Sequence, residues 1–130
     1  MSSNSQMVDY LVDIGALRSD NIIEAFRSVD RADFVADPSA LNVYEDHPLG
    51  IGYSQTISQP RTVAMMMEML SPKEGQKILD IGSGSGWTTA LLAHIVGESG
   101  SVIGVERVDE LVKFGSSNLK KYGFKNKICQ

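Results

Sequence analysis

The sequence is poor in several residue types, and each scarcity excludes a class of structure. It has one cysteine among 130 residues, Cys129, so an internal disulfide is excluded. It has no apolar run near the roughly 18 residues of a membrane-spanning helix, and no secretory signal pattern. Together these absences predict a cytoplasmic protein. The formal net charge of −4 argues against nucleic-acid binding through a general basic surface.

The remaining composition is that of an ordinary globular protein. Hydrophobic residues make up 42% of the chain and charged residues 22%, and the length allows at most one domain. The two histidines, His47 and His94, have no further ligands at metal-site spacing. The sequence therefore predicts no metal site.

Apolar residues at helical spacing predict three helices in the first part of the chain, over residues 7–17, 19–29 and 58–70. Residues 1–6 are polar and are expected to be frayed, and residues 31–57, rich in turn-forming residues, are expected to be mostly loop. The methionines of the third helix are expected to fill gaps in the core. They are Met65, Met66, Met67 and Met69.

The second part of the chain alternates between strands and helices. Strands are predicted over Lys77–Ile81 and Ser101–Val105, and helices over Trp87–Val96 and from a cap at Asp109 to about Gly123; residues 127–130 read as the beginning of a third strand. This order predicts an α/β, Rossmann-like fold: the N-terminal half of a doubly wound parallel sheet, preceded by a helical segment. We therefore expect an N-terminal part of a longer enzyme, with an unpaired sheet edge that favours self-association.

A glycine-rich turn, Gly82-Ser83-Gly84-Ser85-Gly86, joins the first predicted strand to its helix. Gly82 allows a sharp turn, and Gly84 and Gly86 allow the backbone to approach a ligand. Glu106 follows the next strand, 20 residues past Gly86, where a carboxylate accepts hydrogen bonds from ribose hydroxyls. Asp80, two residues before Gly82, would repel a pyrophosphate but suits a cofactor that carries an ammonium group. The pattern predicts S-adenosyl-L-methionine rather than NAD.

Residues 80–86 together with Glu106 resemble the class I S-adenosylmethionine-dependent methyltransferases. A more specific stretch, residues 49–60 (LGIGYSQTISQP), looks like the signature loop of the protein-L-isoaspartate O-methyltransferases. Residues 31–35, 44–46, 106–107 and 110–112 also match that family.

The resemblance implies an activity and a set of site residues. The family transfers a methyl group from S-adenosyl-L-methionine to the free carboxylate of isoaspartyl residues in damaged proteins, which are its partners. Ser58 would be the catalytic serine, and Gln55, Thr56, Ile57 and Ser58 would line the cofactor and substrate cleft. Gly82, Ser83 and Gly84 would hold the methionyl end of the cofactor, and Glu106 its ribose. Residues 1–57 would form a helical segment with the substrate loop, and residues 58–130 the first half of the cofactor domain.

Other interpretations remain open at this point. A methyltransferase of the same fold could act on a small molecule or on nucleic acid, and the chain could also be a cofactor-binding module without activity. Ser58 by itself fits a helix cap as well as a catalytic group.

Overall fold

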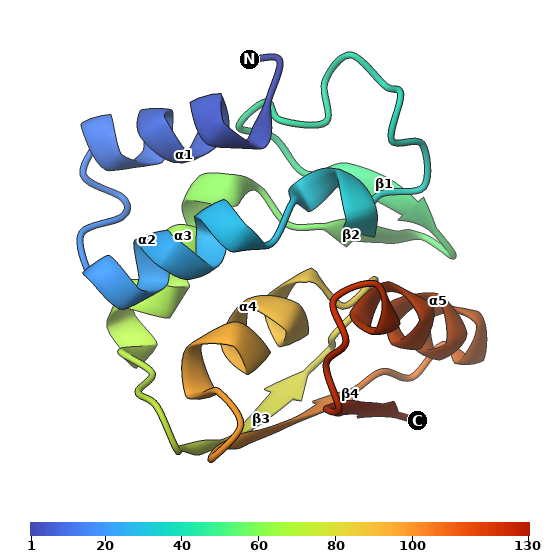
Figure 1. Cartoon of the computed structure of the whole chain (residues 1–130). Helices are drawn as coiled ribbons and strands as arrows, with labels where there is room; N and C mark the ends of the chain where they lie inside the picture. The colour runs from blue at the N-terminus through green and yellow to red at the C-terminus, as the bar shows by residue number, and fades with distance from the viewer. The chain divides into compact units, whose positions relative to one another are not determined.

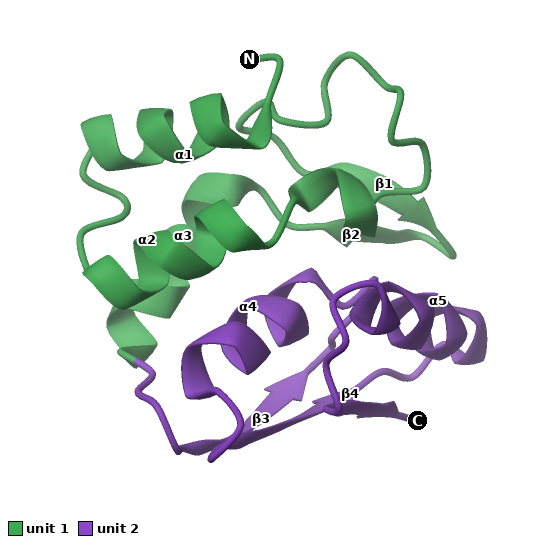
Figure 2. Ribbon diagram, in the orientation of Figure 1, with its two compact units in different colours: residues 1–71 green, residues 72–130 purple.

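A computed structural model describes all 130 residues, which form two compact units: residues 1–71 and residues 72–130 (Figure 2). Figure 1 labels the elements in chain order. Unit 1 contains α1 (Asn4–Asp13), α2 (Asp20–Ser28), the short 3-10 helix η1 (Arg31–Phe34), β1 (Leu49–Gly52), β2 (Gln55–Ile57) and α3 (Pro60–Leu70); unit 2 contains β3 (Lys77–Ile81), α4 (Trp87–Val96), β4 (Ser101–Val105), α5 (Asp109–Lys120) and β5 (Lys127–Cys129). The division that the motifs suggest between residues 57 and 58 concerns function and stays a prediction.

The beginning of the chain is ordered as helix, so the expectation of a frayed end over residues 1–6 is wrong from Asn4 onward. The Ser3 hydroxyl oxygen accepts a hydrogen bond from the Gln6 amide, which caps α1. Asn4 is buried, and its side-chain amide donates to the carbonyl oxygen of Phe26 at 2.8 Å. The polar composition of residues 1–6 predicted a frayed end, but the Ser3 cap and the hydrogen bond of Asn4 to Phe26 hold the helix in place from Asn4 onward.

The helices of unit 1 pack around an apolar core. α1 contacts both α2 and α3, and buried residues come from all three helices and η1. Among them are Met7, Val8, Leu11, Ile22, Phe26, Phe34, Val63 and Met67. These positions confirm the helical spacing predicted for the three segments.

The segment predicted to be mostly loop contains an antiparallel hairpin, β1–β2, in which Leu49 pairs with Ile57 and Gly50 with Thr56. Its two-residue turn is Tyr53-Ser54, and both residues have positive φ, +58° and +57°. Such turns suit the twist of a hairpin but normally use asparagine and glycine. The usual sequence signal for this turn was therefore missing.

The methionines of α3 do not form a core cluster as expected. Met67 is buried, whereas Met65, Met66 and Met69 are 51%, 63% and 84% exposed. Only one face of α3 packs into unit 1, and consecutive methionines cannot all lie on one helical face.

Unit 2 is a three-stranded parallel sheet in the order β3-β4-β5, with Leu79 beside Ile103 and Gly104 beside Ile128. α4 packs on β3 and β4, and α5 packs on β5; both helices lie on one face of the sheet (Figure 1). Alternation along the strands buries Val102 and Ile128 beneath these helices. On the opposite face Leu79, Ile81 and Ile103 are exposed. The predicted α/β fold and the bounds of its strands are confirmed.

The start of α5 differs in one detail from the prediction. Val108, not Asp109, is the capping residue, and its side chain makes no capping bond. Its backbone amide instead donates to the Glu106 carboxylate at 2.8 Å.

In the whole chain, no helix has the length and apolar character needed to span a membrane.

Candidate active site

The glycine turn of unit 2 is built from left-handed backbone. Gly82, Gly84 and Gly86 have φ of +79°, +55° and +94°, a region that residues with a Cβ seldom adopt. The amides of Gly82 and Ser83 both donate to the carbonyl oxygen of Val105, at 2.7 and 3.1 Å. These bonds fasten the turn to the carboxyl end of β4, the edge at which open α/β sheets bind ligands.

Glu106 holds the turn from the neighbouring strand. Its side chain is 6% exposed, with Oε1 accepting from the Gly84 amide at 3.0 Å and Oε2 from the Val108 amide at 2.8 Å. A carboxylate has about four acceptor positions, so these two bonds leave capacity for ribose hydroxyls. The turn and Glu106, which the sequence paired by spacing alone, are in direct contact.

Asp80 lies at the end of β3, below the first turn of α4. Its Oδ2 accepts hydrogen bonds from the hydroxyls of Thr88 and Thr89, both at 2.7 Å. These donors leave acceptor positions on Oδ1 for the ammonium group predicted from the sequence. A carboxylate near the N-terminus of α4 is also favourably placed in the helix dipole.

Two residues of the turn have packing roles that the sequence did not reveal. A Cβ added to Gly86 would lie 3.2 Å from the carbonyl oxygen of Gly115, so Gly86 allows α5 to pack closely against the turn. The Ser83 side chain is buried with an unpartnered hydroxyl, and it lies against Gly104 of β4. Contact of these two residues with a cofactor stays a prediction.

Residues 55–58 form β2 and its exit in unit 1. Gln55 is half-buried, Thr56 is exposed and Ile57 is buried. Alternation along β2 therefore presents Thr56 to solvent and anchors Ile57 in unit 1.

Ser58 is not the cap of α3. The capping residue is Gln59, without a side-chain capping bond, and Pro60 begins the helix. Ser58 is exposed, and its hydroxyl makes no hydrogen bond within the chain. Of the two roles left open by the sequence, the cap is excluded, and the hydroxyl is free to bind a ligand.

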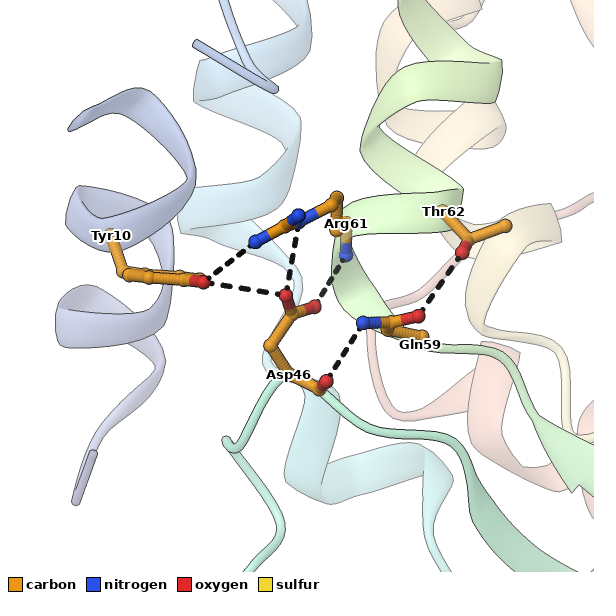
Figure 3. Close-up of polar contacts among 5 residues, drawn as sticks. All are labelled: Tyr10, Asp46, Gln59, Arg61 and Thr62. Carbon is orange, nitrogen blue, oxygen red and sulfur yellow. Dashed lines mark hydrogen bonds and ion pairs between the residues drawn. The ribbon is translucent and has the colours of Figure 1, made fainter. Parts of the chain in front are cut away.

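A buried and a half-buried group hold the chain at Ser58 and at the residues just after it. The guanidinium of Arg31, fully buried in unit 1, donates to the carbonyl oxygen of Ser58 at 2.9 Å. Asp46 accepts from the Arg61 amide at 2.9 Å, and its own carbonyl accepts from the Gln59 side chain at 2.9 Å (Figure 3). Sequence reasoning matched both residues to the family without assigning them a role, because nothing in a linear pattern shows which carbonyl a distant side chain reaches.

The structure thus brings six predicted site residues together in unit 2 and keeps four in one segment of unit 1. The first set is Asp80, Gly82, Ser83, Gly84, Gly86 and Glu106; the second is Gln55, Thr56, Ile57 and Ser58. No group of three or more histidine, cysteine or acidic side chains is placed to hold a metal ion.

The sequence profile of the protein-L-isoaspartate(D-aspartate) O-methyltransferases matches residues 2–130. The chain belongs to this family. It is 43% identical over 122 residues to a protein-L-isoaspartate O-methyltransferase of Methanopyrus kandleri, covering 94% of this chain and 54% of that protein. It is 39% identical to one of Methanospirillum hungatei, covering 100% of this chain and 60% of that protein. The chain spans about half the length of the curated relatives that it matches.

Solved structures of the isoaspartyl methyltransferase family have the same fold. One protein-L-isoaspartate O-methyltransferase superimposes with a TM-score of 0.86 at 30% identity, over 98% of this chain and 41% of that one. A Plasmodium falciparum protein assigned to the same family, crystallised with S-adenosyl-L-homocysteine, also gives 0.86 at 27% identity, over 100% of this chain and 63% of that one. These matches agree with the class I methyltransferase fold expected from the sequence.

Proposed function

We propose that this chain belongs to an enzyme that methylates the free carboxylate of L-isoaspartyl residues in damaged proteins, with S-adenosyl-L-methionine as methyl donor. The observation that carries the proposal is the family match over residues 2–130. A class I fold alone would support many substrates, since fold does not determine function.

The geometry of unit 2 supports the choice of cofactor. Glu106 keeps acceptor capacity for the ribose, and Asp80 keeps an oxygen for the ammonium group. The backbone of the glycine turn is fixed by its hydrogen bonds to Val105 and Glu106. Preorganisation of this kind lowers the cost of ordering a binding site.

The chemistry requires positioning rather than proton transfer. When bound, S-adenosyl-L-methionine would supply a methyl group on a positively charged sulfur. An ionised carboxylate takes this methyl group, the sulfur leaves as a neutral thioether, and no proton is transferred. The substrate carboxylate is already ionised at neutral pH, so no general base is needed. The free hydroxyl of Ser58 donates a hydrogen bond to this carboxylate and orients it, and it adds no negative charge.

The test is a methyl-transfer assay with two peptides of identical sequence, one with an isoaspartyl linkage and one with a normal aspartyl linkage. We expect base-labile methyl ester on the isoaspartyl peptide only, in parallel with binding of S-adenosyl-L-homocysteine by calorimetry. Cofactor binding without any methyl ester would favour a binding module. Methylation of RNA or of a small-molecule acceptor instead would favour another class I methyltransferase.

A further inference from the structure

Arg31 is a buried cation whose guanidinium donates hydrogen bonds to three backbone carbonyls. Its Nε donates to Val43 at 2.9 Å, Nη1 to Ser58 at 2.9 Å and Nη2 to His47 at 3.1 Å. Burial lowers the pKa of Arg31 to about 10, although the charge of Asp46 opposes this effect. The guanidinium is therefore still charged at pH 7, and each bond that it donates is charge-assisted.

The position of Arg31 is itself fixed by neighbouring groups. Its backbone amide donates to the side chain of Asn4, and Asp30 caps η1 by accepting from the Ala32 amide at 2.9 Å. The Tyr44 hydroxyl donates to Asp30 at 2.8 Å. The guanidinium is thus supported by parts of the chain outside the candidate site.

The carbonyl that Arg31 holds constrains the side chain of Ser58. The carbonyl carbon and Cβ of Ser58 are both bonded to its Cα, so with the carbonyl held the Cα–Cβ bond can change direction only by rotation about the backbone torsions φ and ψ of Ser58. On the preceding side, the pairing of Ile57 with Leu49 fixes the backbone. Only rotation about χ1 then remains for the Ser58 hydroxyl.

A second group holds the residues that follow Ser58. Asp46 accepts from the Arg61 amide in the first turn of α3 and lies 3.2 Å from Nε of Arg61, and the Arg61 guanidinium also donates to the Tyr10 hydroxyl at 3.0 Å (Figure 3). The Gln59 side chain donates to the Asp46 carbonyl. Asp46 belongs to the segment 43–47, to which Arg31 also donates hydrogen bonds. Arg31 and Asp46 therefore both connect this segment to residues 58–61.

We propose that Arg31 is a positioning residue for Ser58: its guanidinium fixes the Ser58 carbonyl and thereby the hydroxyl that orients the substrate carboxylate. This inference rests on the proposed function for the role of Ser58. Lysine cannot replace Arg31, because an ammonium group lacks the planar fork that reaches three separate acceptors.

The main test compares Arg31→Lys with two controls. Arg27→Lys makes the same change at an exposed arginine paired with Asp9, and Val8→Ala removes buried volume from α1, a helix that contributes no residue to the candidate site. For Arg31→Lys we expect kcat for isoaspartyl methylation to fall by roughly ten- to a hundredfold, as for displacement of a reacting group by about 1 Å. At temperatures well below its melting temperature, Val8→Ala should keep the kcat of the parent chain, even if it loses as much stability as Arg31→Lys. Equal kcat in Arg31→Lys and the parent chain would overturn the inference.

A second measurement does not depend on activity. NMR relaxation should show new microsecond-to-millisecond motion at the amides of residues 55–59 in Arg31→Lys and not in Arg27→Lys. This measurement decides whether Arg31 holds the backbone around Ser58 even if the 130-residue chain does not methylate the peptide, so it is separate from the test of the proposed function. Unchanged rigidity of these amides would overturn it.

The parent chain also provides a test, should Arg31→Lys fail to fold. The guanidinium protons of Arg31 should exchange with solvent at least about tenfold more slowly than those of exposed Arg27, because they are buried and hydrogen-bonded. Exchange at the rate of Arg27 would overturn the proposed anchoring of Ser58.

Discussion

The carboxylate of Glu106 connects three parts of unit 2: the end of β4, the glycine turn and the start of α5. Its spacing from the turn suggested ribose binding, and its contacts add a structural role that spacing could not show. An acidic side chain at this position satisfies two backbone amides that would otherwise lack partners.

Replacement of Glu106 should therefore affect both binding and stability. We expect Glu106→Ala to weaken binding of S-adenosyl-L-homocysteine by roughly 1–3 kcal/mol, the size of hydrogen bonds to a charged acceptor. Titration calorimetry measures this change, and Glu110→Ala, which removes an exposed acid in the first turn of α5, is the control. Unchanged affinity in a folded Glu106→Ala protein would remove Glu106 from the ribose site.

Ser58 allows a sharper separation of catalysis from stability. Because its hydroxyl caps no helix, Ser58→Ala should change the free energy of unfolding by less than about 0.5 kcal/mol. We expect its isoaspartyl methylation rate to fall about ten- to a hundredfold, the equivalent of one hydrogen bond to a charged group. Denaturant unfolding and the methylation assay test the two expectations together. A full rate in Ser58→Ala would show that this hydroxyl does not orient the substrate.

At the scale of secondary-structure elements, prediction succeeded where local pattern and tertiary packing agree. The strands Lys77–Ile81 and Ser101–Val105 were predicted to the residue, because apolar runs are bounded there by turn-forming residues. The hairpin β1–β2 was missed, since Tyr53-Ser54 adopts a turn that usually requires asparagine and glycine. Arg31 could not be assigned from the sequence, because its three acceptors come from separate segments.

The unusual turn of this hairpin predicts a stabilising substitution. Ser54→Gly should raise stability by up to about 1 kcal/mol, because relief of the left-handed backbone penalty, roughly 1–2 kcal/mol, exceeds the entropy of about 0.4–1 kcal/mol that glycine adds to the unfolded chain. Thermal unfolding measures the change. Ser117→Gly, in the interior of α5, should instead lower stability, because glycine is a poor helix former. Destabilisation by Ser54→Gly would contradict the left-handed turn.

A pH dependence follows from the contact between α3 and the start of α2. Glu68 accepts hydrogen bonds from the Ser19 hydroxyl and from the amides of Ser19 and Arg18. Desolvation by itself would raise the pKa of Glu68, but these hydrogen bonds together outweigh it, so the pKa lies below the ordinary value of 4.5. The stabilisation is therefore present above about pH 4.5 and is lost as the pH falls through the lower pKa of the folded state.

In the parent chain, the melting temperature measured between pH 3 and 7 should fall at the acid end of this range, as expected when a hydrogen-bonded carboxylate is protonated. Glu68→Gln should be less stable at pH 7 and should depend less on pH over the acid range. Glu24→Gln, an exposed acid on α2, is the control. If the melting temperatures of Glu68→Gln and the parent chain fell equally with decreasing pH, the stabilising role of the ionised Glu68 carboxylate would be contradicted.

At the scale of the whole molecule, the face of the unit 2 sheet opposite α4 and α5 exposes neighbouring apolar side chains. Leu79 and Ile103 lie side by side in adjacent strands and are 58% and 47% exposed, next to Ile81 at 79%. Parallel sheets are normally covered on both faces, and contiguous apolar patches promote association. We therefore expect the 130-residue chain to self-associate in a concentration-dependent manner.

Sedimentation velocity over a range of concentrations tests this expectation. The double variant Leu79→Lys and Ile103→Glu places opposite charges side by side on exposed strand positions, so the fold should be retained while association decreases. Leu41→Lys is the matched control, because Leu41 is 98% exposed and lies outside the sheet. Equal association of the double variant and the parent would show that this face is not the contact, and a monomeric parent at all concentrations would contradict the prediction itself.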